Sequence, residues 1–376
     1  MVNPVRFVHT ADWQLGQQAH FVSGDGGAQL RESRLRTIRR IGEVAREFKA
    51  QFVLVAGDVF EHHSIKPDTV RKALDALGEL RLPVYLLPGN HDPYTPDAIY
   101  LSRLWQNECP ANVHVLGSTE PVVLDGVALL PCPLFERHTF DDASEHLHPG
   151  FGPSDCVRIG IAHGGNREIL QRILGDSELE PSNQLPTDLA KRARLDYVAL
   201  GDWHGTFRVD ERTYYSGTHE PTRFKEVDPG NVLLVSISES GSTPTVEKTR
   251  VATHHFVQKQ FLLNSGDDIS QIDGFLAEIS EKDTTLLELT LEGALDMPSR
   301  ILLDELIERT RDRFRFLRTR TDGLHTLLGQ PDQNGLPGDG WLAEVVRRLR
   351  PQADGPLKDE DDRALRNLLR FYKDAS

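Results

Sequence analysis

The sequence is poor in cysteine, lacks long apolar runs and has no excess of positive charge. Each absence excludes or disfavours a class of protein. Three cysteines among 376 residues have no close pairing and are too few for a disulfide framework. No apolar run approaches the roughly 18 residues that a membrane span needs, so we expect no membrane partner. The first residues lead into an apolar stretch without a signal-peptide pattern, and a reducing cytoplasm is the expected setting.

The formal net charge is −14, which argues against a generally basic surface for nucleic acid. Basic clusters do occur at residues 34–40, 191–194 and 309–320. Each cluster is equally compatible with a nucleic-acid contact and with the solvated face of a helix or strand. Carboxylates that bind metal ions would be neutralised locally, so the overall charge does not by itself exclude a DNA-binding function.

The first hundred residues alternate strands with amphipathic helices. Continuous apolar runs at 5–9, 52–56 and 84–87 are typical of strands buried on both faces. Apolar residues recur at three- and four-residue steps over 35–48, and Pro67 opens a second helical pattern. This rhythm predicts an α/β core whose loops at the carboxyl ends of the strands carry the functional residues.

Past residue 113 the strands become shorter and turns separate them. This pattern predicts a second sheet whose strands are joined by mostly direct connections. The expected strands are 113–115, 122–124, 127–130, 157–162, 197–200, 214–215, 232–237 and 246–251.

After about residue 252, strands and helices alternate again without a further motif. The expected elements are strands 256–263, 285–291 and 314–321 and helices 269–279 and 298–311. A stretch rich in Gly, Pro, Gln and Asn then predicts a linker, and amphipathic helices are expected at 340–350 and 357–373. The resulting divisions are 1–252, 253–322, the linker 323–339 and a helix pair within 340–376.

Short polar motifs stand where the predicted strands end, and they contain the side chains that divalent ions bind. They lie at residues 10–14, 57–60, 89–92, 162–164 and 201–204. Asp, Asn and His converging from separate loops supply oxygen and nitrogen ligands at about 2.0–2.2 Å. Because two ions about 3.5–4 Å apart can activate water and neutralise a phosphate, the motifs indicate a two-metal phosphoesterase.

The segments 9–17, 55–61 and 88–92 resemble the nuclease subunit of the SbcCD DNA-repair complex, a calcineurin-like metallophosphoesterase. The order, the spacing and the strand context of the motifs all agree with that family. The resemblance implies an α/β fold of two packed β-sheets flanked by helices, with a small α+β capping domain and a C-terminal helical tail. It assigns residues 1–252 to the nuclease domain and 253–322 to the cap.

The resemblance also implies how the ligands divide between two ions. Asp58 is the natural bridging ligand, because one carboxylate can serve both metals. One ion is expected at Asp12, Gln14, Asp58 and His204. The other is expected at Asp58, Asn90, His163 and Asp202. The alternative for Asp12 and Asp58 is that each only caps the loop after its strand.

His91 is the expected catalytic residue rather than a ligand. In the family the matching histidine faces the scissile phosphate and assists the leaving oxygen. Imidazole suits this role, since it can donate a proton near neutral pH. The alternative is that His91 only orients its neighbour Asn90.

Gln14 and Asp202 depart from the family, which has histidine at both positions. Gln14 offers at most a neutral amide oxygen, whereas Asp202 offers a carboxylate. Both replacements favour harder ions, so Mn²⁺ is expected, with Mg²⁺ as the alternative, over Zn²⁺. A carboxylate is a competent ligand, and the departures therefore do not predict an inactive protein.

The favoured function is a metal-dependent DNA exo- or endonuclease of a repair or defence complex. Its expected partners are DNA, an SMC-like coiled-coil ATPase that the resemblance implies is gripped by the helical tail and, as a further option, a second copy of the chain. The alternative for the tail is that its helices pack on their own domain. One alternative is a phosphodiesterase of the same fold acting on a small or protein substrate. The other is a non-catalytic scaffold, with Gln14 and Asp202 as marks of decay. The cap and tail favour the nuclease over a small-molecule enzyme, and metal content separates both enzymes from the scaffold.

Overall fold

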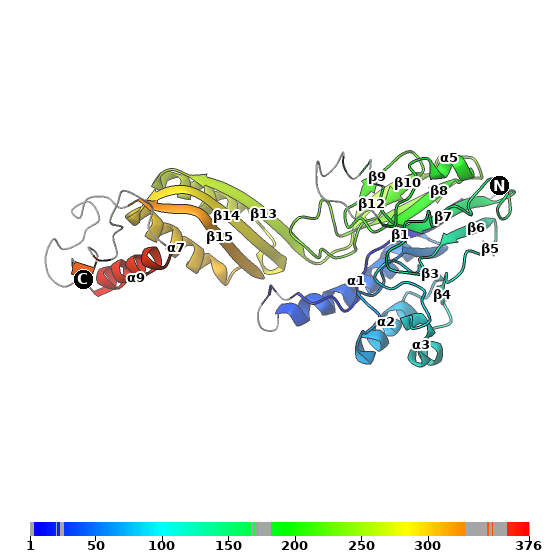
Figure 1. The fold of residues 1–376 in the computed structure, drawn as a ribbon, viewed down its shortest axis with the longest axis horizontal. Coiled ribbons are helices and arrows are strands. Elements are labelled where there is room, and N and C mark those ends of the chain that lie inside the picture. Colours follow the sequence, from blue (N-terminus) through cyan, green and yellow to red (C-terminus); the bar gives the residue numbers. More distant parts are fainter. Residues whose placement is uncertain are drawn as a thin grey trace. The chain divides into compact units, whose positions relative to one another are not determined.

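The computed structural model describes residues 4–19, 21–22, 26–166, 169, 171, 182–327, 344–345, 348 and 359–375. The chain divides into two compact units, Met1–His254 and His255–Ser376 (Figure 1). Over the described residues, no helix combines the length and the apolar character that crossing a membrane requires.

The first unit contains a six-stranded mixed sheet that is parallel at its centre. In pairing order its strands are β12 (Thr245–Arg250), β11 (Asn231–Ile237), β1 (Val5–Thr10), β2 (Phe52–Ala56), β3 (Val84–Leu87) and β4 (Val113–Val115). The strands β1 to β4 run parallel, and β11 pairs antiparallel with β1. The carboxyl ends of β1, β2 and β3 therefore meet at one edge, as the sequence pattern predicts.

Helices α1 (Gly26–Phe48) and α2 (Pro67–Glu79) cover one face of this sheet. The helix α1 buries Leu35, Ile38 and Ile41 at the predicted three- and four-residue steps. Proline begins α2, where its missing N–H costs no hydrogen bond. A short helix, α3 (Arg103–Glu108), follows on the same side.

A second six-stranded sheet packs on the other face of the first. Its pairing order is β5 (Val122–Leu124), β6 (Val127–Cys132), β7 (Val157–His163), β8 (Tyr197–Gly201), β10 (Thr213–Tyr215) and β9 (Phe207–Arg208). Phe7 of the first sheet meets Tyr197 of the second edge to face, with ring centroids 5.3 Å apart. Helix α5 (Leu189–Ala193) covers the outer face of the second sheet. The α/β architecture of two packed sheets flanked by helices is thus confirmed.

The membership and connections of the second sheet differ from the sequence prediction. The predicted strands 113–115, 232–237 and 246–251 are β4, β11 and β12, and all three belong to the first sheet. The strands β6, β7, β8 and β10 are parallel neighbours, so crossovers rather than direct turns join them. Short apolar runs do not reveal their partners, since pairing between sheets is a tertiary property.

The second unit has a three-stranded parallel sheet with two helices. The strands are β13 (His255–Leu263), β14 (Thr285–Asp296) and β15 (Phe316–Leu327), and the helices are α6 (Ile269–Glu278) and α7 (Met297–Arg311). Helix α9 (Asp359–Ala375) buries Leu365 and pairs Arg366 with Asp304 of α7. The predicted linker and the helix at 340–350 lie mostly outside the described residues, and the predicted domain limits stay predictions.

Candidate metal centre

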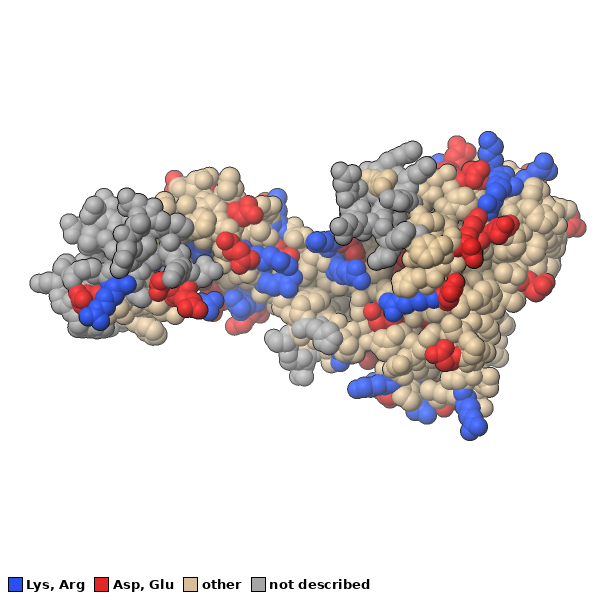
Figure 2. All heavy atoms as spheres, viewed as in Figure 1, with Lys and Arg blue, Asp and Glu red and all other residues tan. Residues whose placement is uncertain are grey.

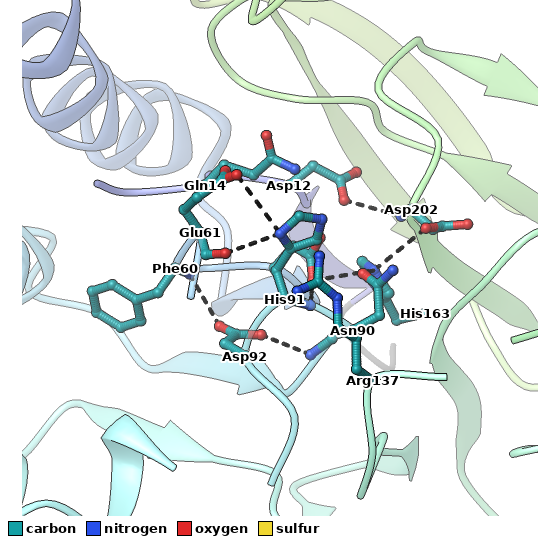
Figure 3. A network of polar contacts seen from close by, with 12 residues as sticks. Asp12, Gln14, Phe60, Glu61, Asn90, His91, Asp92, Arg137, His163 and Asp202 are labelled. Carbon is teal, nitrogen blue, oxygen red and sulfur yellow. Dashed lines mark hydrogen bonds and ion pairs between the residues drawn. The ribbon is translucent and has the colours of Figure 1, made fainter. Parts of the chain in front are cut away.

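The predicted site residues come together where strands of both sheets end (Figure 3). Asp12 and Gln14 follow β1, Asp58 follows β2, and Asn90 and His91 follow β3. From the second sheet, β7 ends at His163, and Asp202 and His204 follow β8. One potential ligand atom from each of Asp12, Asp58 and His163 lies within 4.8 Å of the other two.

The loops that carry the site hold an unusual backbone conformation. Asp12, Gln14, Asp58 and Asp202 have φ angles of 53°, 42°, 56° and 94°. Left-handed geometry costs a residue with a side chain on the order of 1 kcal/mol or more. Backbone hydrogen bonds hold the loops together: Asp12 N donates to Gly57 O at 3.1 Å, and Gln14 N donates to Asp58 O at 2.9 Å. The structure thus holds four predicted ligand positions in a strained conformation.

The Nε2 atom of His163 faces oxygen atoms of neighbouring side chains. Burial would lower the pKa of His163, but Asp58 outweighs burial and raises it. The Nδ1–H of His163 donates to the Ala56 carbonyl at 2.8 Å. The Nε2 atom then lies 3.1 Å from Asn90 Oδ1 and 3.3 Å from Asp58 Oδ1. An oxygen of Asp202 lies 3.9 Å from the same nitrogen. Side-chain oxygens thus converge on one point that calls for positive charge, which the protonated His163 ring or a bound cation can supply.

Three glycines permit this close approach of ligands. A Cβ at Gly57 would lie 2.0 Å from Nδ1 of His163. At Gly89 it would lie 2.2 Å from Oδ1 of Asp58, and at Gly201 it would lie 2.8 Å from the His163 ring. Any larger residue would displace a ligand, so these positions need glycine for contact distance.

Asp12 supplies a second sign of a cation site. Its Oδ1 accepts from the Asp202 backbone N–H at 3.0 Å. Its Oδ2 is buried and has no hydrogen-bond partner within the described part of the chain. A buried unpaired carboxylate oxygen is costly unless an ion or a proton satisfies it. Burial, reinforced by the charge of Asp58, raises the pKa of Asp12 to about 7 against the pull of His163 and His204.

Asp58 stays ionised in the same cluster. Burial alone would raise its pKa, but His163 and His91 outweigh burial and lower the pKa to about 2. Its Oδ1 also accepts from the His91 backbone N–H at 2.9 Å. An ionised carboxylate between the two predicted ligand sets is what a bridging ligand requires.

One ring nitrogen of His91 forms a hydrogen bond that fixes the ring, and the other nitrogen faces the site. Its Nδ1 donates to the Glu61 carbonyl at 2.9 Å, and its Nε2 lies 3.9 Å from Asp58 Oδ2. The side chain is 19% exposed, so a substrate can reach it. In Figure 3 the exposed side chain of Arg137 points towards this edge of the network.

His204 lies within a chain of hydrogen bonds that runs from Gln17 to Glu226. Its Nδ1–H donates to Glu226 Oε1 at 2.6 Å. The amide nitrogen of Gln14 lies 3.1 Å from His204 Nε2, and Gln17 Nε2 donates to Gln14 Oε1 at 3.2 Å. Burial would lower the pKa of His204, but the hydrogen bond to Glu226 outweighs burial and raises it.

Two important carboxylates were not singled out from the sequence. The buried Asp92 accepts from Phe60 N at 3.0 Å, from Gly89 N at 2.8 Å and from Tyr100 Oη at 2.5 Å. It thereby connects the loop after β2 to the loop after β3. Its position next to Asn90 and His91 in the sequence could have indicated this role. Glu226 had no such signal, because only the fold brings it to His204.

Acidic side chains partly neutralise the basic clusters. In each of the three clusters at least one arginine forms an ion pair with a carboxylate. The pairs are Arg39–Glu79, Arg192–Asp142 and Arg320–Glu288. Figure 2 shows basic and acidic side chains interspersed on the visible face of the described residues. A broad basic surface for nucleic acid is therefore absent from that face.

A family model of calcineurin-like phosphoesterases matches residues 5–236, a range that includes every predicted site residue. Among solved structures, TT1561 of Thermus thermophilus is 12% identical with a TM-score of 0.38, and the match covers 66% of this chain and 100% of that one. Another crystal structure is 10% identical with a TM-score of 0.41, and that match covers 66% and 99% of the two chains.

Proposed function

Because the chain belongs to the calcineurin-like phosphoesterase family, we propose that it hydrolyses phosphodiester bonds in DNA with two divalent ions. The observation that carries the proposal is the convergence of oxygen atoms of Asp58 and Asn90 on Nε2 of His163. The buried, unpaired oxygen of Asp12 adds a second demand for positive charge at the same place.

We assign the ligands as the family pattern implies. One ion would be held by Asp12, Asp58 and His204, with Gln14 at or just outside its coordination shell. The other would be held by Asp58, Asn90, His163 and Asp202. When bound, such ions lower the pKa of a water molecule and neutralise phosphate oxygens. The oxygen-rich donor set supports Mn²⁺, with Mg²⁺ as the alternative.

The protein side chains would position the substrate and move the proton. Nε2 of His91 faces the site while Nδ1 is held by Glu61, so the ring is oriented for proton donation to a leaving oxygen. Arg137 is an exposed cation directed towards the same edge and suits an anionic phosphate. Asp12 and Asp58 are buried, which strengthens the attraction of their carboxylates for a cation.

A DNA nuclease of the SbcCD type is supported by the resemblance of segments 9–17, 55–61 and 88–92. The second unit and α9 provide further surface that a small-molecule phosphodiesterase does not need. We propose DNA and an SMC-like coiled-coil ATPase as partners, with a second copy of the chain as a further one. Because acidic side chains partly neutralise the basic clusters, DNA affinity would depend strongly on the ions and on the partner.

The test is hydrolysis of labelled single- and double-stranded DNA with Mn²⁺, Mg²⁺ or EDTA, with and without the ATPase. A cyclic nucleotide serves as the comparison substrate. We expect DNA cleavage with Mn²⁺ and none with EDTA. Cleavage of the cyclic nucleotide alone would replace DNA with a small substrate, and absence of both activities would favour the scaffold.

A further inference from the structure

A chain of hydrogen bonds leads from the buried guanidinium of Arg34 to the metal centre. Arg34 Nη2 donates to Gln17 Oε1 at 3.0 Å, and Gln17 Nε2 donates to Gln14 Oε1 at 3.2 Å. Gln14 Nε2 then lies 3.1 Å from His204 Nε2, and His204 Nδ1 lies 2.6 Å from a carboxylate oxygen of Glu226. We refer to these five residues as the Gln14 relay.

The two ends of the Gln14 relay fix its direction. A guanidinium can only donate hydrogen bonds, and an ionised carboxylate can only accept them. The acceptor oxygen of Gln17 must therefore face Arg34, which leaves its NH₂ group for Gln14. By the same step, the NH₂ group of Gln14 faces His204. The positions of the amide oxygen and nitrogen in Gln14 and Gln17 thus follow from which partners can donate and which can accept.

Burial makes this direction difficult to reverse. Gln14 is 1% exposed and Arg34 is 5% exposed. Arg34 is also held by the carbonyl oxygens of Trp13 at 3.0 Å and Pro221 at 3.2 Å. Turning both amides around would bring the NH₂ group of Gln17 against Arg34, and buried donors would face each other.

The consequence is an asymmetric metal centre. Around His163, lone pairs of neighbouring ligands converge. Around His204, Gln14 presents a hydrogen donor and engages the nitrogen that a metal ion would bind. We propose that the half of the site around His163 binds its ion tightly and the half around His204 binds weakly, because of the Gln14 relay. This inference rests on the proposed two-metal site.

The expected difference in affinity between the two halves follows from the hydrogen bonds that the second ion must break. Ligation by His204 displaces the Gln14 hydrogen bond, and ligation by the Gln14 oxygen would disrupt the relay towards Arg34. Losing one such bond changes a dissociation constant by about 10- to 100-fold. Occupancy of the weaker half would then follow the free metal concentration.

The test is titration of Mn²⁺ into the metal-free chain, with binding followed by calorimetry and by electron paramagnetic resonance. Gln14→His replaces the donor with an imidazole ligand. Gln17→Glu accepts from both Arg34 and Gln14, and so turns the Gln14 oxygen towards the ion. Gln18→Glu adds the same charge at an exposed neighbour outside the relay and is the matched control.

For the unaltered chain we expect two binding steps whose dissociation constants differ by about tenfold or more. Gln14→His and Gln17→Glu should tighten the weaker step and bring out the signal of two interacting Mn²⁺ ions, whereas Gln18→Glu should not. Equal affinities in the unaltered chain, or equal effects of Gln17→Glu and Gln18→Glu, would overturn the relay but leave the proposed function intact. No Mn²⁺ binding at all would overturn the proposed function as well.

Discussion

The buried carboxyl of Asp12 lowers the free energy of unfolding when no ion is bound. Its pKa in the folded chain is about 7, above the ordinary 3.8, chiefly because the carboxyl is buried. The folded state therefore binds more protons than the unfolded state between these values, and Asp12 costs increasing stability as the pH rises through this window. A bound cation would remove that cost.

We predict that Asp12→Asn stabilises the chain in EDTA at pH 8, by on the order of 1 kcal/mol or more in the free energy of unfolding. The gain should shrink as the pH falls towards 5, because Asp12 is then protonated in the folded state. Denaturant titrations of both proteins at several pH values measure the difference. The exposed Asp125→Asn is the control, and a gain that does not change with pH would contradict the assignment.

His91 and Asp58 should separate proton transfer from metal binding. We predict that Asp58→Ala loses both ions and all activity, since it removes the shared ligand. His91→Ala should keep the ions and lose roughly 10²–10⁴-fold in turnover, the usual contribution of general acid–base catalysis. Metal analysis and turnover numbers decide, with the exposed His325→Ala as the control. Normal turnover by His91→Ala would leave only the orienting role for that side chain.

At the scale of elements, the site depends on how closely the ends of β2, β3, β7 and β8 approach. Gly201 closes β8, and a Cβ there would lie 1.9 Å from the Ala56 carbonyl that orients His163. We predict that Gly201→Ala weakens Mn²⁺ binding by at least about tenfold and destabilises the first unit.

The matched control for Gly201 is Gly274 in α6, whose Cβ would meet nothing within 4 Å. Gly274→Ala should leave metal binding unchanged and stabilise its helix by about 0.5–1 kcal/mol. Calorimetric titration and thermal unfolding compare the two. Equal metal affinity in both variants would show that the approach of β8 to β2 does not set the geometry of the site.

Elements and ligands with a local signal could be predicted from the sequence, and tertiary partners could not. The runs 52–56 and 84–87 became β2 and β3 with the predicted bounds, because a buried parallel strand needs an unbroken apolar run. Strand 232–237 was placed in the wrong sheet, since its pairing with β1 leaves no local trace. Glu226 and the link from Arg34 to the site were not predicted for the same reason, since only the fold brings these residues to the metal centre.

At the scale of the whole molecule, the tail is the proposed contact with the ATPase. Helix α9 packs on α7, where Arg366 pairs with Asp304, as expected if the tail packs on its own domain. The docking on the ATPase stays a proposal. We predict that deleting residues 336–376 leaves basal DNA cleavage intact and abolishes co-purification with the ATPase. Arg366→Ala, which loosens α9 without removing it, should weaken co-purification. Unchanged co-purification after the deletion would exclude the tail as the docking site.

Hydrolysis of bis(4-nitrophenyl) phosphate, a generic phosphodiester, by the purified chain tests whether the site is a metal-dependent phosphodiesterase. The unaltered protein and Asp58→Asn are compared in Mn²⁺ and in EDTA. A metal-dependent phosphodiesterase should release nitrophenol with Mn²⁺, stop in EDTA, recover when Mn²⁺ is restored, and lose the activity in Asp58→Asn. Nitrophenol release that persists in EDTA or in Asp58→Asn, or no release in Mn²⁺, would contradict the account.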